Sequence, residues 1–345
     1  MVETTHPLVG AIRWDAWHGE HGVPGKAVEH ALSPAKYHWR LPFFAVVTGE
    51  DQVSIDGTAQ EVMDREIAYA AGAGLDYWAF VTYPEGDAMS LGLQRYLSSR
   101  QREKIGFCLL TEAPRWHDPA FVERVTRLMQ EPGYQTVLQH RPLLYLGFLD
   151  EAQIAKQWTT VQAFREVLDT LRMTLRAKSM GDPYLVILDF SPTHGAKWVE
   201  QLGGDAISSY TMPYAPHAAT PYQQQAQADT KFWEACRATG TAVVPIVTAG
   251  WDRRPRIERP MPWETWQQPG VGLDKYVETA TPQELSEHLK DSLEWMAQHS
   301  AAAPACTSLI YAWNENDEGG WIVPTLQDGT ARLDAIRMML QANRR

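Results

Sequence analysis

Two glutamates near the end of the chain have the residue types and the spacing needed for acid–base chemistry. Glu315 and Glu318 follow an apolar run at residues 307–312 and lie between Trp313 and Trp321. A spacing of three places both carboxylates on one side if the segment makes a single helical turn. Crowded acids in a partly dry cleft raise the pKa of at least one member, which leaves one carboxyl protonated and one ionised. This pairing is the working state of a glycosidase, and indole faces can stack on sugar rings.

A solvated acidic turn is the simpler alternative for this segment. Asp317 adds a third acid, and two glycines follow at residues 319–320. Against a solvated turn, the acids come directly after the last apolar run and are bracketed by tryptophans. We therefore interpret Glu315 and Glu318 as the catalytic pair.

Short apolar runs recur along the chain and would position these acids. The runs lie at residues 9–14, 41–47, 75–83, 105–110, 143–149, 184–188, 206–210, 242–247 and 307–312. Segments with helical spacing of apolar residues lie at 62–73, 119–130, 151–177, 221–238 and 282–299. Strand and helix alternating about eight times indicate a mainly parallel sheet with crossover helices. At this length we predict a closed (β/α)8 TIM barrel with elaborated βα loops, as a single domain over residues 1–345, rather than an open sheet.

The ends of the predicted strands supply the other candidate site residues. In a parallel barrel these ends meet on one face, where the active site lies. The residues near them are mostly acids and aromatics: Trp14, Asp15, Trp17, Tyr83, Glu112, Asp189, Tyr210, Trp251, Asp252, Asn314 and Trp321. Carboxylates accept hydrogen bonds from hydroxyls, and aromatic rings cover the apolar faces of sugars. We expect these side chains to bind a neutral, hydroxyl-rich substrate.

Several of these residues also have structural interpretations. Asp15 could cap a helix or a turn, and Glu112 and Asp189 could pair with arginines in loops. Asp252 could form a local ion pair with the two arginines that follow it. The irregular stretch at residues 251–270 is expected to form an elaborated loop on the catalytic face.

Composition excludes several classes of function. The 345 residues carry a formal charge of −11 without a dense basic run, which argues against nucleic acid and anionic membrane surfaces as partners. No apolar stretch approaches the roughly 20 residues of a membrane helix, so we expect no membrane insertion. The N-terminus has no signal-peptide pattern, which leaves a cytoplasmic protein or one whose signal has been trimmed.

The chain also lacks the signatures of several other active sites. Its three cysteines and its histidines show no metal-ligand spacing, so we predict neither a metal nor an organic cofactor. No Gly-x-Ser-x-Gly elbow is present, which disfavours a serine hydrolase. A dinucleotide-binding glycine fingerprint is also missing after the first predicted strand.

Three segments of the chain resemble those of a known family. Residues 313–319 (WNENDEG) resemble the Asn-Glu-Trp-x-Glu-Gly signature of glycoside hydrolase family 99 and its WbsX-like polysaccharide-biosynthesis relatives. Residues 9–17 (VGAIRWDAW) resemble the family's aromatic-rich first strand end. Residues 244–252 (VPIVTAGWD) resemble its late strand ending in Pro-Gly-Tyr-Asp.

The resemblance implies a (β/α)8 barrel that acts as a retaining endo-α-mannosidase. It implies that Glu318 is the general acid/base, and that Glu315 assists attack by the sugar 2-hydroxyl through an anhydrosugar intermediate. The chain departs from the family pattern at Asn316 and Asp317 and, in the first strand, at Arg13 and Asp15. The expected substrate is therefore an oligosaccharide or polysaccharide that is α-mannoside-like or related.

Two other functions fit parts of the sequence. A glycosyltransferase-like enzyme of surface polysaccharide biosynthesis fits the missing signal, but the chain has no Asp-x-Asp metal motif and no nucleotide-sugar site. A non-catalytic glycan-binding barrel would retain the tryptophans without the geometry of the acids.

Overall fold

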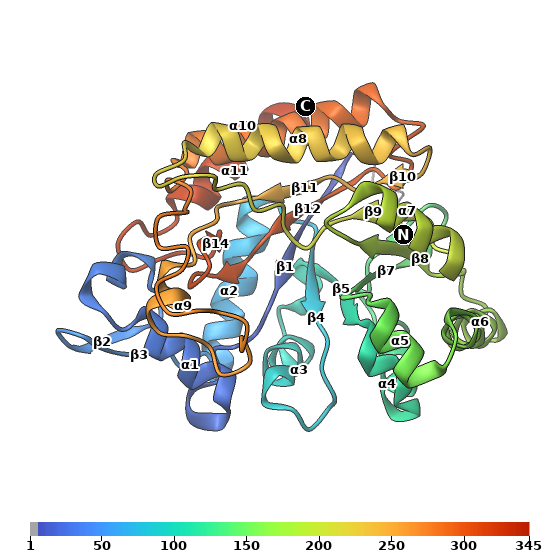
Figure 1. The fold of residues 1–345 in the computed structure, drawn as a ribbon, viewed down its shortest axis with the longest axis horizontal. Helices are drawn as coiled ribbons and strands as arrows, with labels where there is room; N and C mark the ends of the chain where they lie inside the picture. Colours follow the sequence, from blue (N-terminus) through green and yellow to red (C-terminus); the bar gives the residue numbers. More distant parts are fainter. Residues whose placement is uncertain (1–5, 345) are drawn as a thin grey trace.

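A closed parallel barrel forms the centre of the computed structural model, which describes residues 6–344 (Figure 1). Its strands in chain order are β1 (Leu8–Arg13), β4 (Tyr77–Val81), β5 (Gly106–Glu112), β7 (Arg141–Gly147), β8 (Tyr184–Leu188), β9 (Ala206–Ser208), β10 (Ala242–Val243), β11 (Ile246–Thr248) and β12 (Thr307–Tyr311). Because β10 and β11 are two halves of one strand, these nine segments make eight barrel strands. Neighbours in the chain pair in parallel, and β12 pairs with β1. The predicted (β/α)8 barrel is confirmed.

The barrel closes through a strand that a proline divides. The first half, β10, pairs with β9, and the second half, β11, pairs with β12. Between them, the Val244 N–H donates to the Ile207 carbonyl at 2.9 Å, and the Pro245 carbonyl accepts from Leu309 N at 2.9 Å. Proline has no N–H to donate, so it fits the point where the strand changes partners.

The strands are apolar because they are covered on both faces, by the barrel interior and by helices. All five residues of β4 and of β12 are buried. Inside the barrel, the Tyr77 hydroxyl bonds to Tyr145 at 2.8 Å and to Thr307 at 2.9 Å. A Cβ at Gly10 would lie 2.1 Å from the Tyr77 ring, so this glycine is needed to fit the ring. The interior is a packed core.

Helices surround the barrel, and many of them begin at a side-chain cap. The outer helices are α2 (Gln60–Ala73), α3 (Leu91–Ser98), α4 (Pro119–Leu128), α6 (Val161–Ala177), α7 (Pro192–Leu202), α8 (Tyr222–Ala238), α10 (Pro282–Gln298) and α11 (Ala331–Asn343). The remaining helices are α1 (Val23–Leu32), α5 (Glu151–Trp158) and α9 (Arg254–Glu258). The side chains of Asp118, Thr160, Ser191 and Thr281 accept hydrogen bonds from the first turns of α4, α6, α7 and α10. These caps satisfy N–H groups that have no partner within the helix.

The segment at residues 41–47 was predicted as a barrel strand, and this prediction is wrong. The small strands outside the barrel are β2 (Val46–Gly49), β3 (Gln52–Ser54), β6 (Thr136–Val137), β13 (Asn314–Glu315) and β14 (Gly320–Trp321). Val46 and Val47 belong to β2, which pairs only with β3 in an antiparallel hairpin, and their side chains are 57% and 47% exposed. A run of apolar residues cannot by itself distinguish a barrel strand from an exposed hairpin.

The single helix expected at residues 151–177 is two helices. Thr159 has a φ of 69°, which ends α5, and the Thr160 hydroxyl then accepts from Ala163 N at 3.1 Å to begin α6. Interleaved charged and apolar residues continue across this break, so the periodicity alone did not reveal it.

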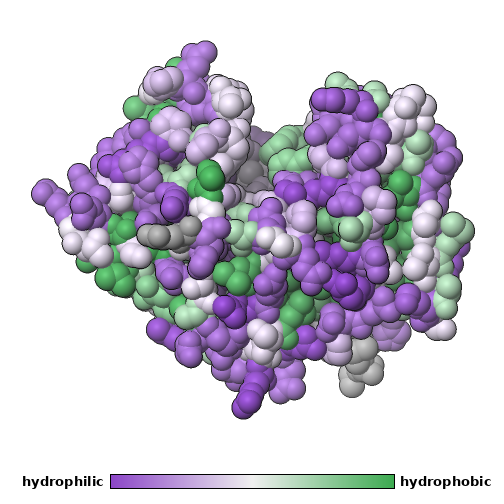
Figure 2. Space-filling model, turned by 90° about the horizontal axis from the view of Figure 1, so that it is seen from below, coloured by the Kyte–Doolittle hydropathy of each residue, from purple (hydrophilic) through white to green (hydrophobic). Residues whose placement is uncertain are grey.

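In Figure 1 β4 points downward and β11 and β12 run toward the left, while α1, α3, α5 and α9 lie in the lower half of the view. Figure 2 views this side from below and shows it hollowed at the upper edge between two lobes. No helix within residues 6–344 is long and apolar enough to cross a membrane.

Candidate active site

A short hairpin carries both predicted catalytic glutamates beyond the carboxyl end of β12. Its strands β13 and β14 pair antiparallel, with Asn314 opposite Trp321 and Glu315 opposite Gly320. The Glu318 N–H donates to the Glu315 carbonyl at 3.1 Å, so a single turn joins the two acids. Their relative position is therefore set by local backbone geometry.

Two glycines let this hairpin lie close to its neighbours. Gly319 has a φ of 93°, and a Cβ there would lie 2.4 Å from the Asp252 nitrogen. At Gly320, a Cβ would lie 2.2 Å from the Tyr311 ring. The Asp252 N–H donates to the Glu318 carbonyl at 2.6 Å, which ties the hairpin to the loop that follows β11.

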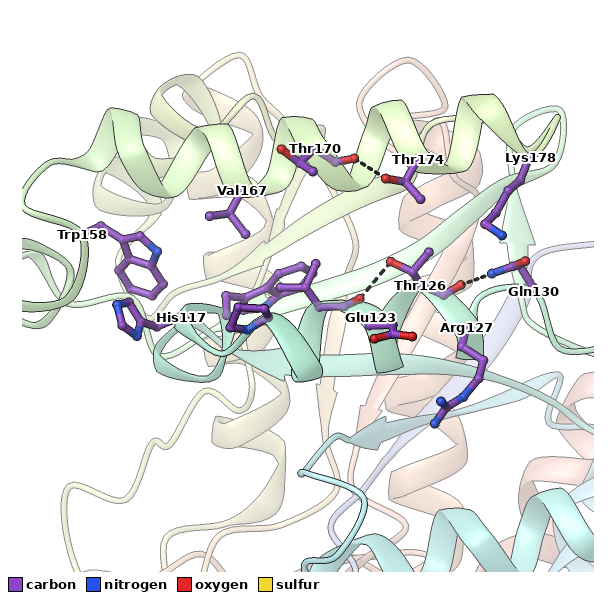
Figure 3. Close-up of a pocket in the computed structure, with 13 residues that line it drawn as sticks. His117, Glu123, Thr126, Arg127, Gln130, Trp158, Val167, Thr170, Thr174 and Lys178 are labelled. Carbon is purple, nitrogen blue, oxygen red and sulfur yellow. Dashed lines mark hydrogen bonds between the residues drawn. The ribbon is translucent and has the colours of Figure 1, made fainter.

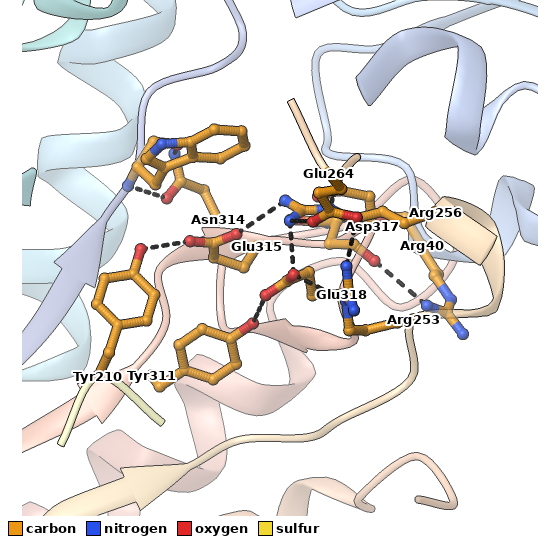
Figure 4. A network of polar contacts seen from close by, with 12 residues as sticks. Arg40, Tyr210, Arg253, Arg256, Glu264, Tyr311, Asn314, Glu315, Asp317 and Glu318 are labelled. Atoms are coloured by element: carbon orange, nitrogen blue, oxygen red, sulfur yellow. Dashed lines mark hydrogen bonds and ion pairs between the residues drawn. The ribbon is translucent and has the colours of Figure 1, made fainter. Parts of the chain in front are cut away.

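Three acids of the hairpin are buried around one arginine (Figure 4). The exposed fractions are 2% for Glu315, 1% for Asp317 and 8% for Glu318. Arg256 of α9 donates to Glu315 Oε2 at 3.3 Å, to Asp317 Oδ2 at 2.6 Å and to Glu318 Oε1 at 2.5 Å. Burying acids is costly unless they are paired and hydrogen-bonded, and this guanidinium supplies both.

A second guanidinium and a fourth acid complete the cluster. Arg253 Nε donates to Glu318 Oε1 at 3.1 Å, and its Nη2 pairs with Glu264. Glu264 also accepts from Arg256 Nη1 at 3.2 Å. All three residues come from the irregular stretch at residues 251–270, which lies directly against the two glutamates, as expected of a loop on the catalytic face.

Two tyrosines donate to the remaining oxygens of the catalytic pair. The Tyr210 hydroxyl, just beyond β9, donates to Glu315 Oε1 at 2.5 Å. The Tyr311 hydroxyl, at the end of β12, donates to Glu318 Oε2 at 2.6 Å. Burial, reinforced by the nearby glutamates, raises the pKa of both tyrosines well above the usual value. Both side chains therefore remain neutral phenols that can donate.

The pair holds a proton at neutral pH. Burial, followed by the nearby charge of Glu318, raises the pKa of Glu315 from its ordinary 4.5 to about 8. Arg256 and the Tyr210 hydrogen bond act in the opposite direction. Glu318, in contrast, accepts hydrogen bonds from two guanidinium groups, whose positive charges complement an ionised carboxylate. Burial therefore favours the protonated form of Glu315 near neutral pH.

Three predicted binding residues lie together beside this pair. Trp14 and Asn314 exchange two hydrogen bonds, from Trp14 N to Oδ1 at 2.9 Å and from Nδ2 to the Trp14 carbonyl at 2.8 Å. The Trp14 indole donates to the Tyr83 hydroxyl at 2.8 Å, and the Arg256 guanidinium lies 5.2 Å from the Trp14 ring centroid. Trp14 and Tyr83 are partly exposed, so their rings can reach a ligand.

Two solved structures share this fold, whereas comparisons of sequence find no match. The chain matches no family model and no curated protein. The glycoside hydrolase family 99 endo-α-mannosidase from Bacteroides thetaiotaomicron, in complex with BIS-TRIS propane, superposes with a TM-score of 0.56 at 13% identity, over 98% of this chain and 97% of that chain. Another structure of a family 99 endo-α-mannosidase from this organism gives 0.54 at 14% identity, over 97% of each chain. The chain has the fold of the family 99 barrels. The fold implied by the sequence resemblance is thereby confirmed.

Two of the tryptophans predicted to bind substrate are buried in this family 99-like barrel, so their rings are not open for a sugar to stack on. Trp17 is 7% exposed and packs edge-on against Phe44 at 5.2 Å. Trp321 is 2% exposed and lies between the guanidinium groups of Arg40 and Arg332, at 5.8 Å and 4.3 Å. Trp251 is partly exposed, and its ring lies 6.1 Å from that of Tyr311.

The predicted acids lie in ion pairs or polar networks of their own. Asp252 is 4% exposed and pairs with Arg40 and Arg254, the latter at 2.7 Å. Glu112 accepts from Arg115 at 2.5 Å. These contacts match the structural interpretations that the sequence left open for both acids.

Asp15 and Asp189 each bond to a neighbouring basic side chain. Asp15 accepts from Arg13 at 2.7 Å, and burial raises the pKa of Asp15 to about 6 although Arg13 opposes the shift. Its Oδ1 lies 3.5 Å from Asn314 Nδ2, so Asp15 supports the residue next to Glu315. Asp189 pairs with His194 at 2.6 Å beyond β8.

Sequence reasoning missed the arginines of the site. It interpreted Arg253 as a partner in a local ion pair with Asp252 and gave Arg256 no role. The available signal was three arginines within residues 253–256, in a loop that was already placed on the catalytic face. Among residues 6–344, no group of three or more His, Cys, Asp or Glu side chains is arranged to hold a metal ion.

Proposed function

We propose that this protein is a retaining glycoside hydrolase in which Glu315 and Glu318 carry the reaction. The observation that carries the proposal is the burial of both carboxylates in one turn at the barrel mouth, where burial raises the pKa of Glu315 to about 8. The family 99-like fold over nearly the whole chain supports it. Residues 1–345 would form one catalytic domain.

The proposed reaction uses the sugar's own 2-hydroxyl as the nucleophile. Glu315 takes the 2-hydroxyl proton while the 2-oxygen attacks the anomeric carbon and the bond to the leaving oxygen breaks. Glu318 gives its proton to that oxygen, which leaves an anhydrosugar. Glu318 then takes a proton from water as the water oxygen attacks the anomeric carbon, and Glu315 returns its proton to the 2-oxygen. The sum is hydrolysis with retention.

This reaction requires Glu318 to be free to give a proton to the leaving oxygen when substrate binds. In the free protein, Glu318 Oε1 accepts from Arg253 at 3.1 Å and from Arg256 at 2.5 Å. Substrate must displace these guanidinium groups to bring a leaving oxygen to Glu318. Their departure would free Glu318 Oε1 to contact the leaving oxygen. The 251–270 loop would therefore open before each reaction.

The proposed substrate is an α-mannoside-like glycan or a related polysaccharide. Trp14, Tyr83 and Trp251 offer partly exposed rings around the pair, and Asn314 holds Trp14 in place. The departures at Asn316 and Asp317 place an amide and an additional acid next to the pair. Asn316 Nδ2 donates to the Arg40 carbonyl at 2.5 Å, so it fixes the turn and does not face a sugar.

Release of reducing sugar from a panel of α-mannans and bacterial polysaccharides tests the hydrolase. Wild type should release sugar from at least one member, and Glu318→Gln should lower kcat by about 100- to 10,000-fold, the usual contribution of a general acid. Glu287→Gln on the exposed side of α10 is the matched control and should keep full activity. A Glu318→Gln variant with undiminished kcat would remove the role proposed for Glu318.

A non-catalytic glycan-binding barrel is the second candidate, and one observation favours it. Arg253 and Arg256 both donate to Glu318 in the free protein. These bonds suit a site in which Glu318 never has to contact a leaving group. This candidate predicts oligosaccharide binding without turnover, unchanged by Glu315→Gln or Glu318→Gln. Detectable hydrolysis by wild type alone would eliminate it.

A further inference from the structure

A pocket adjoins the catalytic pair where β7, β8 and β9 end. Its walls come from the three strand ends, at residues 147–149, 188–190 and 209–210, and from His194 of α7. The cavity volume is about 220 Å³, below the about 300–1,000 Å³ of pockets for drug-sized ligands. A pocket of this size suits a single ring rather than a longer segment of a glycan.

Two phenylalanines of this pocket expose their rings to solvent. Phe148 is 50% exposed and directly follows the last residue of β7. Phe190 is 59% exposed and lies two residues beyond the end of β8. Phe148 also has a φ of 57°, a left-handed conformation that is unfavourable for a bulky residue and is often retained at functional sites. Exposed rings at a pocket on the catalytic face provide an apolar platform for a ligand.

The other side of the pocket is polar. Asp189 Oδ2 lies 2.6 Å from His194 Nδ1, while Asp189 Oδ1 accepts from Ser191 N at 2.8 Å. The His194 side chain is 33% exposed and the Asp189 side chain 11% exposed. His194 Nε2 lies 3.1 Å from Glu151 Oε1, so both ring nitrogens are engaged and His194 holds Asp189 in place. The Asp189 carboxylate can accept further hydrogen bonds from hydroxyl groups, and it lines the same cavity as the rings.

The pocket is continuous with the catalytic centre through one side chain. Tyr210 lines the pocket, and its ring centroid lies 5.7 Å from that of Phe148. The hydroxyl of the same residue donates to Glu315 Oε1 at 2.5 Å. Only the Tyr210 side chain would therefore lie between a ligand in the pocket and the catalytic pair. This position suits a sugar unit that neighbours the unit bound at the pair.

A larger groove on the outer wall lacks these properties. It has a volume of about 680 Å³ and lies between α4 and α6 (Figure 3). The hydroxyls of Thr126, Thr170 and Thr174 donate to carbonyls of their own helices, so their methyl groups remain to line the groove. This groove lies between two outer helices and is not lined by the strand ends or by any residue that contacts the two glutamates.

We propose that the pocket at the ends of β7, β8 and β9 is a subsite for one hexopyranose unit of the substrate. The sugar's apolar face rests on Phe190 and Phe148, and its hydroxyls donate to Asp189, which His194 holds in place. The subsite rests on the proposed function, because it receives the unit next to the one that Glu315 and Glu318 act on. It makes Phe190 a determinant of substrate length.

Calorimetric titration of the Glu318→Gln protein tests this subsite separately from catalysis. The probes are three pairs of sugars: α-mannobiose with α-mannotetraose, maltose with maltotetraose, and cellobiose with cellotetraose. In at least one pair the tetrasaccharide should bind at least tenfold more tightly than the disaccharide. Phe190→Ala should remove most of that tenfold gain, and Phe190→Trp should restore it. Met338→Ala, which removes a 68% exposed side chain from α11, should leave it unchanged.

The outcomes separate the subsite from the hydrolase. If wild type hydrolyses a glycan and the Phe190→Ala variant still binds the tetrasaccharide tenfold more tightly than the disaccharide, the subsite is overturned and the hydrolase is retained. Binding that depends on Phe190 without any hydrolysis would overturn the hydrolase and leave a glycan-binding pocket. Binding of none of the tetrasaccharides would overturn the subsite as proposed.

Discussion

Arg256 Nη1 lies 2.5 Å from Glu318 Oε1, and both side chains are buried at the mouth of the barrel. Through its other nitrogens, the same guanidinium contacts Glu315 and Asp317. One cation therefore compensates several buried acids. Arg256 is therefore needed to stabilise the folded site, and it also occupies the position at Glu318 that a substrate would contact.

Replacement of Arg256 by methionine should destabilise the protein strongly. Removing one partner of a buried ion pair leaves uncompensated charge and costs about 3–5 kcal/mol. Urea denaturation at pH 7 measures the loss. Arg337→Met is the matched control, because the Arg337 pair with Asp334 is exposed and should contribute at most about 1 kcal/mol. Equal losses for the two variants would show that the buried cluster contributes no special stability.

The shared proton should make stability depend on pH. The folded-state pKa of Glu315 is raised from 4.5 to about 8, so the folded state binds more protons than the unfolded state in that range. The contribution of Glu315 is fully present below about pH 4.5 and is lost as the pH rises through about 8. Glu315→Gln cannot titrate, so its stability relative to wild type should increase between pH 5 and pH 9. Parallel urea-denaturation curves across this range would contradict the raised pKa.

Activity should also fall above about pH 8. The proposed reaction needs one proton on the Glu315–Glu318 pair, and the pair loses its last proton near the raised pKa of Glu315. We therefore expect kcat/KM to decrease about tenfold per pH unit above that value. A profile of kcat/KM from pH 5 to pH 10 measures it. A flat profile to pH 10 would show that the reaction does not use this proton.

Tyr210→Phe should move the fall in kcat/KM to higher pH. The Tyr210 hydroxyl donates to Glu315 Oε1, and this hydrogen bond lowers the pKa of Glu315. Without it the proton is held more tightly, so the fall in kcat/KM should begin at a higher pH than in wild type. Tyr96→Phe is the matched control, since the Tyr96 hydroxyl is buried and donates to the Ile105 carbonyl at 2.7 Å, away from the pair. An equal shift in both variants would mean that the effect is general rather than local.

The sequence predicted the barrel because its strands are buried on both faces and read as separate apolar runs. It placed Glu315, Glu318, Trp14 and Tyr210 on one face because parallel strands end there, and the structure brings these residues together. The run at 41–47 was misassigned because an exposed hairpin can be as apolar as a buried strand.

The arginines could not be placed from the sequence. Arg256 and Glu318 are 62 positions apart in the chain, and no periodic pattern connects them. The burial of Trp17 and Trp321 could not be predicted either, because the sequence does not distinguish a tryptophan that packs in the core from one that binds a sugar. Tertiary contacts between loops decide both questions.

The β13–β14 hairpin places both acids within a single turn, and this has a consequence for how the site can change. Shifts of the barrel wall move Glu315 and Glu318 as one unit, so they alter where the pair meets a glycan without altering the spacing within the pair. Loops around the mouth can then be lengthened or exchanged to accept other sugars while the chemistry is preserved. Under the proposed function, substrate choice and reaction would be determined by separate parts of this chain.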